Sequence, residues 1–154
     1  MHPLRIATLL VLVLALVMIQ CKKDEDPVTP AATIPAEMVG TWVFAGLTVN
    51  GDPANNPGDY FPLEDGTVGI EVDVKADGSF DWREYDAQSN INGTAQGTIS
   101  VSGTTASMIV SVENGTPVNP PEVRFVGVYN ITGTTMTLTA SLQGNTLVLT
   151  LLKK

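Results

Sequence analysis

An alternation of apolar and polar residues with a period of two runs through this chain from about residue 40 onward. Between residues 68 and 74, valine or isoleucine occupies every second position, and between 135 and 142 methionine, leucine and alanine alternate with threonine and serine. Successive side chains of a β-strand point to opposite faces, so this pattern predicts half-buried strands. Nowhere in this region does a helical period persist for ten residues. The alternation therefore predicts an all-β domain.

Turn-forming residues divide the domain into eight predicted strands. Gly103-Thr104, Gly133-Thr134 and Gly144-Asn145 each place glycine first in a two-residue loop, which is typical of a type II′ hairpin. A three-residue loop, Ala76-Asp77-Gly78, joins another pair of strands. The predicted strands are 40–49, 67–75, 79–86, 94–102, 105–113, 123–131, 135–142 and 146–152.

The registers set by these four turns are consistent with the apolar pattern. Directly opposed residues of a hairpin share one face, and in each hairpin the apolar sets fall on the same face. The predicted opposed pairs are Val74–Phe80, Ile99–Met108, Tyr129–Leu138 and Ala140–Leu149. We therefore expect an eight-stranded antiparallel up-and-down meander β-barrel.

The connections differ in length between the two ends of such a barrel. Consecutive turns of a meander alternate between the ends, so the tight turns at 76–78, 103–104 and 133–134 share one end. The long connections share the other end, and they are 50–66, 87–93 and 114–122. One end is thus predicted to be closed, and the other to form a binding mouth surrounded by loops.

The inward-facing residues are expected to be large at the closed end and small at mid-height, where Gly127 faces Ala140. An eight-stranded barrel is just wide enough to be filled by its own side chains or to hold one small ligand. Both interpretations stay open, because glycines also ease the coiling of strands at closure. The candidate ligand-binding residues are Gly46, Tyr60, Phe61, Val68, Glu84, Phe125, Gly127, Ala140, Leu142 and Leu147.

Three of these candidates carry alternative interpretations. Glu84 falls on the inward face near the mouth, where a carboxylate could orient a polar or cationic group of a ligand. If the strand is bulged or has passed the rim at that point, Glu84 lies in water instead. Tyr60 and Phe61 belong to a long loop, and they could close the mouth, meet a partner or pack on the barrel rim.

Residues 39–152 resemble the lipocalin and calycin group, and more closely the short lipocalin-like domains of Bacteroidota lipoproteins. The resemblance rests on the eight-stranded meander, the long first loop and Gly40-Thr41-Trp42, which matches the family's Gly-x-Trp. It implies that Gly40 and Trp42 close one end of the barrel. The family's arginine that covers this tryptophan is missing, and Lys153 is the only candidate substitute. The helix that follows the barrel in the family and its disulfides are also missing.

The first twenty residues predict a lipoprotein signal peptide. Arg5 supplies a positive charge, and residues 6–19 are apolar except for Thr8. A helix of this length spans roughly 21 Å, less than the roughly 30 Å of a hydrocarbon core, so the segment fits a secretory signal better than a membrane anchor. Met18-Ile19-Gln20-Cys21 resembles a bacterial lipobox, with Gln20 where a small residue is usual.

The resemblance to a lipobox predicts a diacylglycerol on Cys21 and attachment to a membrane through this lipid. We expect the chain in the cell envelope, at the outer membrane of a bacterium. Residues 21–36 are rich in charge, proline and threonine, and they predict a flexible linker before the lipocalin-like barrel domain, 37–154.

Removal of the signal peptide would leave seven basic and sixteen acidic side chains, a net charge of −9, and no histidine, because His2 is the only one. With Cys21 occupied no free thiol remains either, which excludes Ser-His-Asp and Cys-His catalysis and zinc sites of the Cys/His kind. So acidic a surface repels nucleic acid. We therefore expect no enzyme, no cofactor and no nucleic-acid partner.

The registers bring two acidic residues, Asp73 and Asp81, opposite each other on the outer face of one hairpin. Two solvated carboxylates are the default interpretation, and a weak calcium site is the alternative. No loop with regular Asp spacing supplies six oxygen ligands, so no metal is predicted.

Together these features predict a membrane-anchored lipoprotein with a non-enzymatic barrel domain that binds a small, largely apolar ligand. The alternative is a structural or interaction lipoprotein with a filled barrel, whose loops bind another cell-envelope protein. The size of the barrel interior separates the two.

Overall fold

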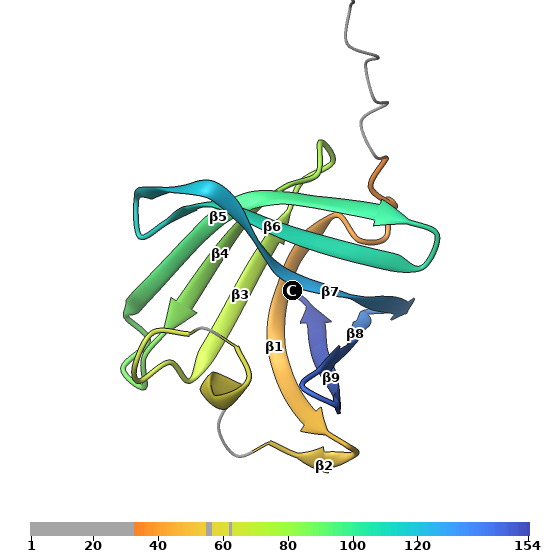
Figure 1. Ribbon diagram of the computed structural model, residues 1–154, viewed down its shortest axis with the longest axis horizontal. Coiled ribbons are helices and arrows are strands. Elements are labelled where there is room, and N and C mark those ends of the chain that lie inside the picture. Colours follow the sequence, from red (N-terminus) through yellow and green to blue (C-terminus); the bar gives the residue numbers. More distant parts are fainter. Residues whose placement is uncertain (1–32, 55–56, 62) are drawn as a thin grey trace, which may run out of the picture. The chain divides into compact units, whose positions relative to one another are not determined.

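A computed structural model describes residues 33–54, 57–61 and 63–154 of the chain (Figure 1). Within these residues the protein is all-β, apart from one short 3-10 helix, η1, Pro57–Asp59. The strands are β1 Gly40–Val49, β2 Asp52–Pro53, β3 Gly69–Val74, β4 Ser79–Tyr85, β5 Ile91–Ser102, β6 Thr105–Glu113, β7 Thr116–Thr132, β8 Thr135–Leu142 and β9 Asn145–Lys153.

The strands form one antiparallel sheet that closes on itself. Each long strand pairs with the next along the chain, and β1 also pairs with β9, which joins the two ends of the sheet. The short β2 pairs only with β1 and stands outside the ring. The predicted fold class is confirmed: this is a closed eight-stranded up-and-down β-barrel with one extra strand.

Three of the four predicted hairpin registers are confirmed. Val74 pairs with Phe80, Ile99 with Met108 and Tyr129 with Leu138. The glycines that make these turns, Gly78, Gly103 and Gly133, have φ of 84°, 59° and 60°. A positive φ is nearly free of steric cost only for glycine, so these positions fix where each strand reverses.

The β8–β9 register differs from the predicted one by two residues. Ala140 faces Leu147 rather than Leu149, because the turn consists of Gln143 and Gly144. Both have positive φ, 51° and 83°, which is a type I′ turn and not the type II′ turn predicted at Gly144-Asn145. A shift of two residues leaves every side chain on its predicted face.

The predicted long connection 114–122 is wrong. Asn114 and Gly115, with φ of 48° and 75°, make a tight turn, and β7 begins directly after it at Thr116. Asn-Gly is the strongest short hairpin signal in a sequence, and here it marks a type I′ turn. Register shifts interrupt the β6–β7 pairing twice, next to Ile109 and around Val110 to Val112, so β7 is strongly bent. The loop predicted at 87–93 is also shorter, because β5 begins at Ile91.

A bulge in β1 overturns the inward placement of Gly46. Phe44 pairs with Leu151 and Gly46 with Thr150, so Ala45 is the extra residue of the bulge. An extra residue reverses the faces of everything that follows, and Leu47 is therefore buried while Gly46 leaves the inner face. A Cβ on Gly46 would have no atom within 4 Å.

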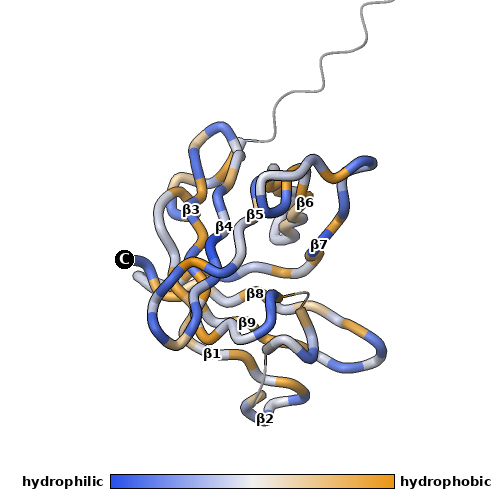
Figure 2. The backbone as a smooth tube through the Cα atoms, turned by 90° about the vertical axis from the view of Figure 1, so that its left-hand side faces the viewer, coloured by the Kyte–Doolittle hydropathy of each residue, from blue (hydrophilic) through white to orange (hydrophobic). Residues whose placement is uncertain are grey.

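The buried apolar side chains, from Ile34 to Leu151, form one core cluster. Hydrophobic and hydrophilic residues alternate along the strands (Figure 2). Ile34 precedes the predicted domain start at residue 37, yet its side chain is buried. No helix among the described residues is long and apolar enough to span a membrane. The predicted signal peptide and Cys21 lie outside the described residues.

Candidate functional site

The three residues expected to close the barrel lie together at the end that holds the turns at 76–78, 103–104 and 133–134. Trp42 is fully buried, and its indole Nε1 donates a hydrogen bond to the carbonyl oxygen of Met38, 2.8 Å away. The ammonium group of Lys153 lies 5.2 Å from the centre of the Trp42 ring and donates to the carbonyl oxygen of Glu37. Gly40 has a φ of 131°, and a Cβ there would lie 2.9 Å from Lys153 Cε. This end is therefore closed by a tryptophan under a lysine, a cation–π contact.

The opposite end, predicted to be an open mouth, is covered by residues 63–67, which we call the strap. Its anchor is Glu84, which is 5% exposed. Glu84 Oε2 accepts hydrogen bonds from the backbone N–H of Glu64 and the hydroxyl of Thr67, both at 2.8 Å, and Oε1 accepts from Trp82 Nε1 at 3.0 Å. Glu84 is thus neither in water nor turned toward a ligand, but holds the strap to β4.

Two asparagines fasten the strap to neighbouring strands. Asn92 on β5 donates to the backbone carbonyl of Asp65 and to the Thr67 hydroxyl. Asn114, in the β6–β7 turn, donates to the carboxylate of Glu64 over 2.7 Å. The strap is thus hydrogen-bonded to β4, β5 and the β6–β7 turn.

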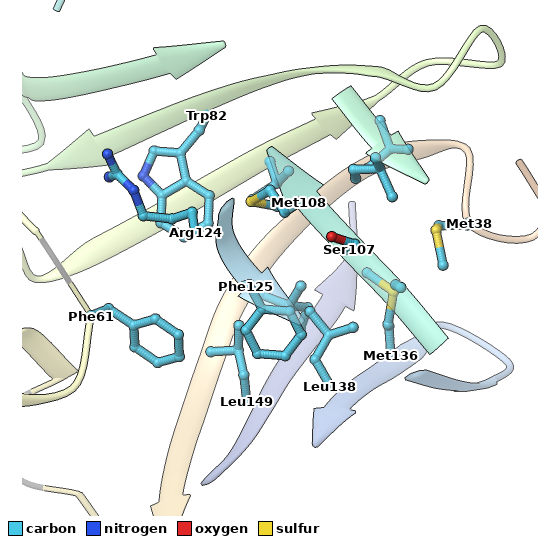
Figure 3. A pocket seen from close by; sticks show the side chains of 15 residues that line it. Met38, Phe61, Trp82, Ser107, Met108, Arg124, Phe125, Met136, Leu138 and Leu149 are labelled. Carbon is cyan, nitrogen blue, oxygen red and sulfur yellow. The ribbon is translucent and has the colours of Figure 1, made fainter. Parts of the chain in front are cut away.

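Beneath the strap lies an apolar inner cavity of about 50 Å³ (Figure 3). Methionines contribute flexible walls: Met38 and Met136 lie toward the closed end and Met108 lies near Trp82. The side chains around it that are not apolar are those of Ser107 and Arg124. Met38, Phe61, Val72, Val74, Trp82, Ile99, Ala106, Ser107, Met108, Arg124, Phe125, Met136, Leu138, Leu149 and Leu151 line it.

A second hollow, which we call the side pocket, lies where β7 separates from β8. The β7–β8 pairing ends at Val128 and Thr139, whereas β8 continues beside β9 to Leu142. The side pocket has a volume of about 90 Å³ and shares Phe61, Arg124 and Phe125 with the inner cavity. The rings of Phe61 and Phe125 stack with their centroids 6.5 Å apart. Since both rings line both hollows, they lie between the inner cavity and the side pocket. Tyr60, Phe61, Arg124, Phe125, Val126, Ala140, Ser141, Leu142 and Leu147 line the side pocket.

Most of the predicted ligand-binding residues meet at this side pocket and not at the axial mouth. Six of the ten line it: Tyr60, Phe61, Phe125, Ala140, Leu142 and Leu147. Leu142 is nevertheless 42% exposed, because it lies at the end of β8.

The other four predicted residues have different roles or positions. Gly127 lies at the split itself, where a Cβ would overlap the Thr139 carbonyl oxygen and approach Phe125 Cζ to 2.6 Å. Glu84 anchors the strap and Gly46 leaves the inner face. Val68 is 63% exposed and lies directly before β3, so it does not line the barrel interior.

Arg124 is the site residue that the sequence pattern missed. A strict alternation along the predicted strand 123–131 places Arg124 on the outer face, because its neighbour Phe125 faces inward. Met108 pairs with Phe125 and Ile109 with Val123, so Arg124 is the extra residue of a bulge, and it joins Phe125 in lining both hollows. Its guanidinium Nη2 lies 2.9 Å from the carboxylate of Glu113 and 3.7 Å from that of Glu122.

The acidic pair on the outer face is occupied by protein groups. Asp73 and Asp81 face each other as predicted. Lys75 contacts Asp81 over 2.8 Å, and this hydrogen bond lowers the pKa of the Asp81 carboxyl. The Thr41 hydroxyl donates to Asp73 over 3.2 Å. Among the described residues, no group of three or more His, Cys, Asp or Glu side chains is placed to hold a metal ion.

No protein-family model, curated protein or solved structure matches this chain. We therefore describe the structural class of this protein by its fold and its candidate site. It is a closed eight-stranded β-barrel with an apolar inner cavity, a strap over one end and a side pocket between β7 and β8.

Proposed function

We propose that this chain is a lipid-anchored, lipocalin-like protein of the bacterial cell envelope whose barrel takes up a small, largely apolar ligand without catalysis. The observation that carries the proposal is the apolar inner cavity with an adjoining pocket at a split in its wall. The anchor and the location rest on the sequence of residues 1–21.

The route into the barrel is the side pocket, since the axial end is covered by a hydrogen-bonded strap. The inner cavity of about 50 Å³ is smaller than an apolar cavity of roughly 150 Å³ that holds benzene. A ligand therefore occupies both hollows, and the stacked Phe61 and Phe125 rings separate to admit it. The three methionine side chains can adopt other rotamers at low cost and so enlarge the inner cavity.

The test uses a neutral fluorescent probe, N-phenyl-1-naphthylamine, whose emission rises in apolar surroundings. We expect the native domain to bind it and Ala140→Phe to reduce binding at least tenfold, because the added ring fills the side pocket. The free energy of unfolding of Ala140→Phe should change little, since the ring enters existing space. The matched control is Ala87→Phe, which places the same ring on an exposed loop and should leave probe binding unchanged.

The second candidate function is an interaction module with a filled barrel, and the exposed valines of β7 favour it. Val123, Val126 and Val128 are all about half exposed on one strand. If this is the function, the native domain does not bind the probe, and Ala140→Phe costs about 1–3 kcal/mol from overpacking. That pair of results would end the ligand-carrier proposal.

A further inference from the structure

An open hollow, which we call the outer groove, lies between the strap and the beginning of β7. It has a volume of about 480 Å³. Leu63 and Val118 give it an apolar wall, and both side chains also pack against the core, so the wall is held in place. Pro117 adds a further apolar surface with a fixed backbone φ. The outer groove therefore offers an apolar contact surface that is open to solvent.

The outer groove also carries negative charge. Glu64 lines it from the strap and Glu113 from the end of β6. Glu64 accepts a hydrogen bond from the neutral Asn114, and it forms no ion pair with any residue that the structure describes. Glu113 and Glu122 both contact the guanidinium of Arg124. Three carboxylates and one guanidinium leave a net charge of −2 at the outer groove.

The other basic side chains of the described residues are engaged elsewhere. Their partners are Asp81 for Lys75, the Trp42 ring for Lys153, and Glu71 for both Arg83 and Lys154. The negative charge of the outer groove is thus not neutralised by any of these four groups. A positively charged partner complements it, and opposite charges also speed the encounter of two proteins.

The combination of wall and charge favours a lysine side chain as the occupant. Lysine carries its charge at the end of a four-carbon stem, and such stems lie along apolar surfaces while the ammonium group meets polar groups or water. A second copy of the chain has a net charge of −8 and is repelled. The chain enters the barrel at the closed end, where Ile34 lies beside Gly78, so the outer groove is remote from this entry.

We propose that the outer groove docks an extended, lysine-bearing segment of a partner protein. The lysine stem lies on Leu63 and Val118, and its ammonium group meets the carboxylate of Glu64. This interaction goes beyond the proposed function and is separate from ligand uptake, because the outer groove shares no lining residue with the inner cavity or the side pocket.

The experiment measures the fluorescence anisotropy of three labelled six-residue peptides at pH 7. In each peptide serine alternates with one test residue, so that the test side chains share a face when the peptide is extended. The test residues are lysine, 2,4-diaminobutyrate, which has the same charge on a stem two methylenes shorter, and glutamine, which is neutral. We expect the lysine peptide to bind at least tenfold more tightly than the glutamine peptide and several-fold more tightly than the diaminobutyrate peptide.

Two variants locate the interaction. Glu64→Gln removes one charge from the outer groove and keeps an acceptor oxygen for Asn114, so it should weaken binding of the lysine peptide at least fivefold. Glu37→Gln makes the same change at an exposed residue of the closed end and should alter binding less than twofold. Val118→Ser makes the wall polar and should remove the advantage of lysine over diaminobutyrate. Glu64→Gln keeps the proposal testable if Val118→Ser does not fold.

Three results would overturn the proposal. Equal affinities for the lysine and diaminobutyrate peptides would mean that the stem makes no contact, and equal effects of Glu64→Gln and Glu37→Gln would mean that binding follows overall charge. Tighter peptide binding by Lys22→Ser/Lys23→Ser would assign the outer groove to the chain's own linker instead of a partner. Failure of N-phenyl-1-naphthylamine to bind would affect only the proposed function, because that probe reports on the barrel interior.

Discussion

At the scale of single residues, two glycines of the barrel strands, Gly97 and Gly46, have opposite steric surroundings. A Cβ on Gly97 would overlap the carbonyl oxygen of Ile109, because β5 and β6 approach closely at a bulge. A Cβ on Gly46 would meet nothing within 4 Å. We expect Gly97→Ala to lower the free energy of unfolding by about 1–3 kcal/mol, because the backbone of β5 or β6 must move to make room for the methyl group. Gly46→Ala should be neutral or stabilise by about 0.4–1 kcal/mol through the unfolded chain.

Urea denaturation of both variants beside the native domain measures these differences. Each glycine variant is the control for the other, because both add one methyl group to a strand. A strongly destabilised Gly46→Ala would show that Gly46 points inward and that the bulge at Ala45 is misplaced.

A buried carboxylate, Glu84, is the second residue whose replacement is informative. Three donors point at its two oxygens, and glutamine offers only one acceptor oxygen. Glu84→Gln should therefore leave at least one buried donor without its acceptor and lower the free energy of unfolding by about 1–3 kcal/mol. Asp65→Asn makes the same chemical change at an exposed position of the strap and should cost less than about 0.5 kcal/mol. Equal stabilities of the two variants would mean that Glu84 does not hold the strap.

At the scale of elements, Glu71 links β3 to β4 and to the residue that follows β9. Its carboxylate accepts from Arg83 Nη1 and Lys154 Nζ, each at 2.9 Å, and the Glu71 side chain is 13% exposed. The hydrogen bond from Lys154 is the largest cause that lowers the pKa of Glu71 below its ordinary value of 4.5, and Arg83 adds to it. A lowered pKa in the folded state means that the carboxylate stabilises the fold above 4.5 and that this contribution is lost as the pH falls through the folded-state pKa.

Glu71→Gln should therefore cost about 1 kcal/mol at pH 7, and the difference from the native domain should shrink as the pH falls below 4.5. Urea denaturation between pH 7 and about pH 3 measures it. Asp52→Asn on the exposed β2 is the control, because Asp52 forms no ion pair within the part of the chain that the structure describes. A constant difference at all pH values would contradict the lowered pKa.

Turn chemistry and strand period account for the elements that could be predicted from the sequence. Gly103 and Gly133 each come first in a two-residue loop, and this local signal placed their hairpins correctly. Asn114-Gly115 is an equally local turn signal, and the predicted strand 123–131 begins seven residues after β7 does because it treats 114–122 as one long connection. The bulges at Ala45 and Arg124 have no comparable signal in the sequence, because each depends on how two strands coil around a shared core.

The residues of the candidate site also divide into those that local sequence signals predict and those that depend on tertiary structure. Phe125, Ala140 and Leu147 were identified because their faces follow from period and register alone. The alternation does not predict Arg124 as a site residue, because Arg124 is itself the extra residue of a bulge. It leaves Glu84 either in water or facing a ligand, because the strap that hydrogen-bonds to Glu84 lies 20 residues away in the sequence. Contacts between a loop and a strand depend on loop conformation, which the period of two does not constrain.

At the scale of the whole molecule, the charge of the chain bears on how it is held at a membrane. After removal of the first twenty residues it carries a net charge of −9, so anionic head groups repel the domain. We therefore propose that membrane attachment depends on acyl chains at Cys21, each contributing about 0.8 kcal/mol per buried methylene, with more than one chain needed for stable anchoring. Since this attachment is hydrophobic, a wash with high salt should not release the native protein.

We expect cells fed radiolabelled palmitate to label the native protein, and Cys21→Ser to lose the label and move from the membrane to the soluble fraction. Thr29→Ser, a similarly small change in the predicted linker, is the matched control and should stay labelled and membrane-bound. An unlabelled Cys21→Ser protein that still sediments with membranes would mean that residues 6–19 are retained as the anchor. The lipid proposal would then fail, whereas the proposal of a ligand-binding barrel would stand, because it rests on the core and the pockets of the described residues.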